Sequence, residues 1–236
     1  MNTDHGSTVG HEHANVTGGW LRPAVFGAMD GLVSNFALIA GVAGGGASRS
    51  VIILAGLAGL SAGAFSMAAG EYTSVASQAE NAEAEIAKER AELRANPLGE
   101  QAELASTFVE RGVEPDLARE VARQIHLNPD VAVEVHAREE LGVTMDDLPS
   151  PMLAAVSSFL SFGLGAIIPV IPYLLGAEAL MPVVIVSLLG LFVCGAVVTR
   201  LTSRPWWFGG LRQLTLGAVA AGLTYLIGNL VGAGLG

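Results

Sequence analysis

Charged residues are scarce in this sequence, and basic residues are the scarcest of them. Only 14% of the 236 residues are charged, while 51% are hydrophobic. A soluble domain carries about a quarter charged residues, so this composition excludes an ordinary soluble protein and indicates a membrane protein. The 12 Lys and Arg stand against 22 Asp and Glu, which gives a net charge of -10. That balance disfavours nucleic acid as a partner and favours cations.

Cysteine and one common metal motif are also missing. Cys194 is the only cysteine, so neither a disulfide nor a cysteine-based metal site can form within one chain. The acidic insert described below contains no Glu-x-x-His, the motif from which helical bundles build di-iron sites. A membrane-anchored ferroxidase or metal-storage protein is therefore the less favoured alternative.

What the sequence does have is long apolar segments. A bilayer-spanning helix needs about 20 residues, and five segments reach this length: 23–46, 50–70, 152–175, 180–199 and 213–235. The predicted fold class is all-α, a polytopic membrane protein with five transmembrane helices. Pro169 and Pro172 are expected to kink the third span. Glycines such as Gly56, Gly63 and Gly228 favour close helix contacts, either within the chain or between two copies.

Acidic charge is concentrated in one insert between the second and third spans. Residues 80–147 hold 17 acidic and 7 basic side chains, whereas the rest of the chain has five of each. After Tyr72 the sequence is rich in Ala and Glu, without Pro or Gly until Pro97, so the second span is expected to continue there as one helix. Shorter helices, divided near Gly112, Pro115 and Pro129, are expected to complete a compact bundle. The predicted divisions are a polar tail 1–21, two spans in 22–75, the acidic domain 76–148, and three spans in 149–236.

Basic residues between the spans set the predicted orientation. If the N-terminus is cytoplasmic, the short segments on that side carry four arginines and those on the opposite side carry Arg49 alone. We therefore expect the tail and the acidic domain in the cytoplasm and the C-terminus across the membrane. The tail holds no basic cluster and does not read as a cleaved signal peptide, which favours a bacterial inner membrane. Its histidines, His5, His11 and His13, are more typical of a tail without function than of a metal site.

Asp30 lies inside the first span, about 10 Å from its start. Burying a carboxylate in lipid costs at least about 2–3 kcal/mol, and no basic residue in the spans is placed to neutralise it. Asp30 must therefore be protonated, face water or bind a cation, unless it only caps a helix break near Gly31. Ser34 follows one turn later on the same helical face, which favours a polar pathway.

Met67 and Glu71 lie four residues apart at the end of the second span, on one helical face. One soft and one hard ligand suit a transition metal such as Fe²⁺ better than Ca²⁺ or Mg²⁺. A methionine on a helix is more often a packing residue, so the pair carries the argument.

Carboxylates in the acidic domain recur at helical spacing. Three residues separate Glu89 from Glu92 and Glu100 from Glu103, and four separate His136 from Glu140. Each pair presents two ligands on one face, as in helix-bundle metal sites. Solvated glutamate-rich helices are also common, but Lys and Arg balance these charges only partly. A bound divalent cation would remove the repulsion.

Three sequence stretches resemble the vacuolar iron transporter family, which includes the yeast calcium cross-complementer and plant nodulin-like members. They are Asp30-Gly-Leu-Val-Ser-Asn-Phe36, Ser66-Met-Ala-Ala-Gly-Glu-Tyr72 and Pro169-x-x-Pro172-Tyr173. The resemblance extends from Leu21 over nearly the whole chain. It implies a homodimeric exporter of Fe²⁺, and often of Mn²⁺, driven by a counter-flow of protons.

The resemblance also implies roles for individual residues. Asp30 and Met67 would line the transport path, with Glu71 at its cytoplasmic edge. The acidic domain would bind Fe²⁺, Mn²⁺ or Zn²⁺ through glutamates, which here are Glu89, Glu92, Glu100, Glu103 and Glu140. His136 and Ala137 replace two methionines of the family pattern, and histidine is itself a good ligand for Fe²⁺ or Zn²⁺. No permanent cofactor and no enzymatic activity are expected, and a passive metal channel remains an alternative to a proton antiporter.

Overall fold

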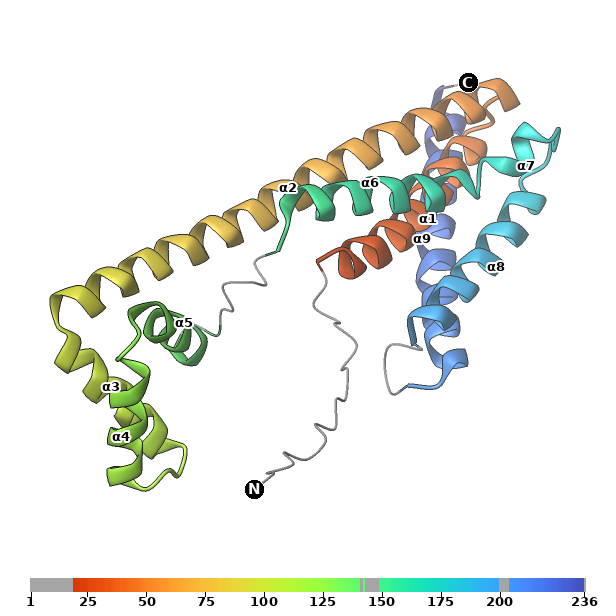
Figure 1. Cartoon of the computed structure of the whole chain (residues 1–236). Helices are drawn as coiled ribbons and strands as arrows, with labels where there is room; N and C mark the ends of the chain where they lie inside the picture. Colours follow the sequence, from red (N-terminus) through yellow and green to blue (C-terminus); the bar gives the residue numbers. More distant parts are fainter. Residues whose placement is uncertain (1–18, 141, 143–148, 200–203, 236) are drawn as a thin grey trace, which may run out of the picture.

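The computed structural model of this chain describes residues 19–140, 142, 149–199 and 204–235. Over this part of the chain the structure is all-helical, as predicted from the sequence (Figure 1). Its helices are α1 (Leu21–Gly44), α2 (Arg49–Ala95), α3 (Pro97–Glu110), α4 (Pro115–Ile125), α5 (Pro129–Glu140), α6 (Pro151–Ile167), α7 (Ile171–Leu174), α8 (Met181–Val198) and α9 (Trp206–Leu235). The tail histidines and Arg200, one of the four arginines predicted to lie on the cytoplasmic side, are outside the described residues.

Four of the helices are long and apolar enough to cross a bilayer: α1, α2, α8 and α9. The predicted third span, 152–175, is not one continuous helix. Helix α6 ends at Ile167 and the short α7 begins only at Ile171. Pro169 and Pro172 explain the break, because a proline has no amide hydrogen and its ring clashes with the preceding turn. The predicted kink is therefore confirmed, and α6 alone is shorter than predicted, at about 25 Å.

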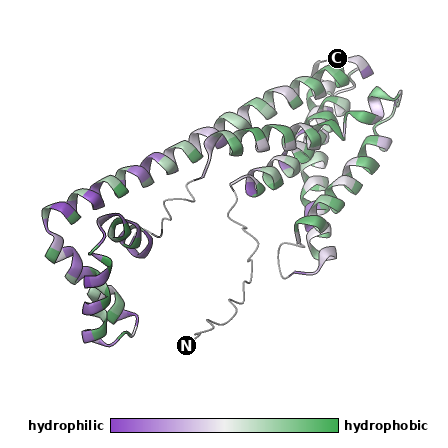
Figure 2. Ribbon diagram, in the orientation of Figure 1, coloured by the Kyte–Doolittle hydropathy of each residue, from purple (hydrophilic) through white to green (hydrophobic). Residues whose placement is uncertain are grey.

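Helix α2 runs for 47 residues without interruption. It passes from an apolar first half into an acidic second half, and Figure 2 shows this change from green to purple along its length. Asn96 ends it and, through Oδ1, accepts a hydrogen bond of 3.2 Å from the amide of Gly99 at the start of α3. At 1.5 Å per residue the helix is about 70 Å long, so it extends well beyond any bilayer core.

Helix α1 is the centre of the apolar body and contacts α2, α6, α8 and α9 (Figure 1). Glycine makes the closest of these contacts possible. A side chain at Gly228 of α9 would overlap the carbonyl of Gly41, and one at Gly31 would overlap the carbonyl of Phe162 in α6. In α2, Gly63 leaves room for the ring of Phe162. These glycines therefore serve packing within the chain, one of the two uses that the sequence left open.

Two polar side chains join the helices of this body. Asn35 of α1 is buried, and its Nδ2 donates to the carbonyls of Gly56 in α2, at 3.1 Å, and Ala166 in α6, at 2.6 Å. Thr224 of α9 donates to the carbonyl of Ala37 in α1 at 2.7 Å. Because apolar surroundings make an unpaired polar group costly, these bonds fix how the helices sit against α1.

The acidic half of α2 carries a small helical domain made of α3, α4 and α5 at its far end (Figure 1). Helix α5 packs on α2 through Val133 and Ala137 against Ile86. Leu104 of α3 and Ala122 of α4 form a second apolar cluster beside them. The helix boundaries near Gly112, Pro115 and Pro129 agree with the predicted breaks.

Candidate metal centre

An acidic cavity of about 330 Å³ lies where α2, α3 and α5 meet. It is lined by Glu85, Lys88, Glu89, Glu92, Glu100, Glu103 and Glu140. Six of these seven residues are carboxylates. The structure therefore brings together all five glutamates that the sequence analysis selected in this domain.

Helical periodicity explains how α2 supplies its share of the lining. Glu85, Glu89 and Glu92 are spaced by four and three residues, so they share one face of the helix. The turn at Asn96 then reverses the chain, and Glu100 falls in the first turn of α3. Negative charge is favoured there because the unpaired amides of a helix N-terminus carry partial positive charge.

His136 of α5 is fully buried and contacts two glutamates of the cavity lining, Glu89 and Glu140. Its Nδ1–H donates to Glu140 Oε1 at 2.8 Å, and Nδ1 lies 3.1 Å from Glu89 Oε1. Glu89 is only 6% exposed, and its Oε1 has no hydrogen-bond partner. Ligand atoms of Glu89, Glu100 and His136 lie within 4.8 Å of one another. In the described part of the chain, these three residues are the only group of His, Cys, Asp or Glu side chains close enough to hold one metal ion together.

The electrostatics of this cavity favour a cation. Burial raises the pKa of Glu89, and the nearby charge of Glu140 raises it further. Burial and Glu103 likewise raise the pKa of Glu100. The only basic residue in the lining, Lys88, is 3.9 Å from Glu92 and largely exposed. Carboxylates that are crowded and poorly compensated favour a bound divalent ion.

Sequence reasoning missed three residues of this site: Glu85, Lys88 and His126. The spacing of Glu85 from Glu89 was a usable signal, because four residues along a helix return to the same face. His126, at the end of α4, had none. Its ring lies edge-on to that of His136, with centroids 5.2 Å apart, and its Nδ1–H donates to the carbonyl of Ala122 at 2.8 Å. His126 thus packs edge-on against the His136 ring and helps to fix its position.

The residues selected in the apolar body are arranged differently. Asp30 and Ser34 lie together on an exposed face of α1. Met67 is half-buried and packs against the apolar cluster that contains Phe162 and Ala166 of α6, while Glu71 is half-buried one turn further along α2. The structure therefore gives Met67 a packing role. In the described residues neither Asp30 nor Glu71 belongs to the group of three His, Cys, Asp or Glu side chains that could hold a metal ion.

The depth of these residues can still be ordered along the helices. Helices α1 and α2 are antiparallel, and Asn35 lies opposite Gly56. At 1.5 Å per residue, Asp30 is at about the level of Ser61, and Met67 and Glu71 follow toward the acidic domain. The order from that domain inward is therefore Glu71, Met67, Asp30.

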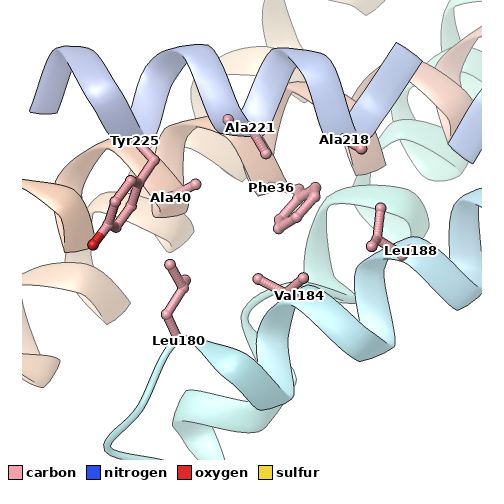
Figure 3. A pocket seen from close by; sticks show the side chains of 9 residues that line it. Phe36, Ala40, Leu180, Val184, Leu188, Ala218, Ala221 and Tyr225 are labelled. Carbon is pink, nitrogen blue, oxygen red and sulfur yellow. The ribbon is translucent and has the colours of Figure 1, made fainter. Parts of the chain in front are cut away.

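A second cavity, of about 210 Å³, lies between α1, α8 and α9 (Figure 3). It is lined by Phe36, Ala40, Leu180, Val184, Leu188, Ala218, Ala221, Gly222 and Tyr225. None of these side chains is charged, so this cavity lacks ligands for a metal ion.

Comparison with known proteins agrees with the resemblance found in the sequence. Residues 21–229 match the VIT family. The chain is 40% identical to a vacuolar iron transporter of Acanthamoeba castellanii over 234 residues, which are 96% of this chain and 82% of that protein. It is 30% identical to vacuolar iron transporter 1 of Arabidopsis thaliana over 225 residues, 94% of this chain and 90% of that protein. It is 32% identical to a vacuolar iron transporter of Centaurea cyanus over 218 residues, 91% and 89% of the two chains.

Proposed function

Because this chain belongs to the VIT family, we propose that it is a transporter that exports Fe²⁺, and also Mn²⁺, from the cytoplasm in exchange for protons. Relatives named as iron transporters and four long apolar helices support the transport of metal across a membrane. The observation that carries the proposal is the acidic cavity. It sits at one end of α2, whose other end is an apolar helix of membrane-spanning length.

The first step is capture of the metal by the acidic domain. Carboxylate oxygens and the His136 nitrogen are hard and borderline donors, which suit Fe²⁺, Mn²⁺ and Zn²⁺. Methionine sulfur is absent from the lining of the cavity. The domain is therefore expected to select among metal ions by their charge and coordination geometry more than by their preference for soft ligands.

The second step is passage through the apolar body. The metal would move from Glu71 past Met67 to Asp30, which follows their order in depth. Protonation of Asp30 from the far side would then release it, because a neutral carboxyl group is a poor ligand. This step couples export of metal to entry of protons.

We propose that α6 and α7 together make the third of five spans. Ser157 of α6 donates to the carbonyl of Trp20 at 2.8 Å, beside the start of α1. Arg49 donates through Nε to the carbonyl of Tyr173 in α7 at 2.9 Å, beside the start of α2. Since α1 connects the same two levels, α6 and α7 cover the same thickness. The proposed topology keeps the N-terminus and acidic domain cytoplasmic and the C-terminus opposite, in a bacterial inner membrane.

We also propose that two copies pair through α1. Phe26 and Leu38, at 57% and 39% exposure, lie on the same exposed face as Asp30 and Ser34. In a single chain this face would turn Asp30 toward lipid, at a cost of at least about 2–3 kcal/mol. A second copy across it would enclose two such carboxylates around a shared path.

The test is Fe²⁺ uptake by proteoliposomes with and without an imposed proton gradient. We expect uptake by the wild type to follow the gradient and to be abolished in Asp30→Asn, which keeps the shape and removes the charge. Met67→Leu keeps the packing against Phe162 and removes the sulfur, so slower uptake would assign the sulfur a ligand role. Uptake that ignores the gradient would identify a passive channel instead. Oxidation of Fe²⁺ without uptake would identify a ferroxidase.

A further inference from the structure

One face of α2 connects the acidic cavity with the edge of the apolar body. Glu71 and Glu89 are 18 residues apart, which is five turns of an α-helix, so the two side chains point the same way about 27 Å apart. Helix α2 has no break between them. A line along the helix surface joins Glu71 to Glu89. The polar residues between them that lie within about 60° of this line around the helix axis, together with its two ends, form what we call the α2 stripe: Glu71, Ser74, Gln78, Glu85 and Glu89.

The middle of the α2 stripe is open and hydrogen-bonded. Ser74 and Gln78 are exposed, and Gln78 Nε2 donates to Ser74 Oγ at 3.2 Å. Because the amide nitrogen of Gln78 makes this bond, its side-chain carbonyl oxygen is not used in it and can face a cation. At its far end the stripe enters the cavity through Glu85 and Glu89.

We propose that the α2 stripe is the route by which a divalent cation passes between the acidic cavity and Glu71. This inference rests on the proposed function and names residues that it leaves unassigned. The Oε1 atom of Glu89, which is buried and accepts no hydrogen bond, marks the end where a ligand is expected. Seven residues, or about 10 Å, separate Gln78 from both Glu71 and Glu85. Neutral oxygen ligands in the middle can accept a hydrated ion without retaining it.

The experiment places a positive charge on the stripe and a matched one on the other side of the helix. Gln78→Lys puts the charge midway along the route. Ala84→Lys is exposed and about 140° around the helix from Glu71, so it adds the same charge away from the route. Gln78→Glu controls for loss of the glutamine itself. Each full-length variant is compared for Fe²⁺ binding in detergent and for the initial rate of Fe²⁺ uptake by proteoliposomes at low metal and low salt.

In water, a lysine ammonium about 6 Å from a divalent ion lowers the ion's occupancy of its position about tenfold, before screening by salt. We therefore expect Gln78→Lys to slow uptake up to about tenfold while Fe²⁺ binding is unchanged. Ala84→Lys and Gln78→Glu should transport at least as fast as the wild type. Equal uptake rates for Gln78→Lys and Ala84→Lys would overturn the proposed route but leave the proposed function standing. A wild-type protein that binds Fe²⁺ but never transports it would overturn the proposed function as well.

Discussion

Replacing Glu89 by glutamine should have opposite effects on the metal-free and the metal-bound protein. Glu89 is buried, lies 3.1 Å from His136 Nδ1 and has an oxygen without a hydrogen-bond partner. Glutamine keeps the shape and removes the charge. Without metal, the change removes repulsion from the other carboxylates of the cavity. With metal, it removes a charged ligand.

The size of the first effect follows from the distance to Glu100. Ligand atoms of the two residues lie within 4.8 Å, and two like charges at that separation repel by about 3 kcal/mol at an effective dielectric constant of about 20. Glu100 is partly exposed, so solvent reduces this to about 1 kcal/mol. In a chain of this size, that corresponds to a melting temperature about 2–4 °C higher. Loss of one charged ligand should lower metal affinity at least about tenfold.

The assay is thermal unfolding of the full-length protein in detergent, with and without Mn²⁺. Bound metal stabilises a protein in proportion to the logarithm of its concentration over its dissociation constant. The variant should therefore melt higher than the wild type in the absence of Mn²⁺ and show a smaller increase when Mn²⁺ is added. A variant that melts lower without metal, or that shows the full increase, would refute this account of the cavity.

Three further predictions follow from the same structure. The pKa values of Glu89 and Glu100 are raised, so the folded protein binds protons more tightly than the unfolded chain. The stability of the metal-free protein should therefore rise as pH falls from neutral toward 4.5. Mn²⁺ binding, measured by titration, should weaken over the same range. Asn35→Ala should lower the melting temperature, because it leaves two buried carbonyls without their donor at a cost of about 1–3 kcal/mol. Gly228→Leu should destabilise more than Gly222→Leu in the same unfolding assay, because a side chain at Gly228 meets the carbonyl of Gly41 and a Cβ at Gly222 meets nothing within 4 Å.

Most of the fold could be predicted because its signals are local. Apolar length predicted α1, α2, α8 and α9, and the Ala- and Glu-rich sequence up to Pro97 predicted that α2 continues unbroken. The third span was harder. Hydropathy measures the length of the apolar run, 152–175, but Pro169 divides that run into two helices by removing a backbone hydrogen bond.

The site was predictable where its residues share a helix. Spacing identified Glu89 with Glu92 and His136 with Glu140, but not that α2 and α5 bring these pairs together. His126 could not be found, because its contact with His136 depends on how α4 turns into α5. Met67 was selected as a ligand through its spacing from Glu71, and the structure shows that packing against α6 also accounts for its place.

The most direct test of the central claim is to record Fe²⁺ entry and internal pH together in proteoliposomes whose outer face carries the acidic domain. The account predicts that Fe²⁺ enters as protons leave, with a rate that increases with the internal proton concentration. Fe²⁺ entry without any change in internal pH would contradict it.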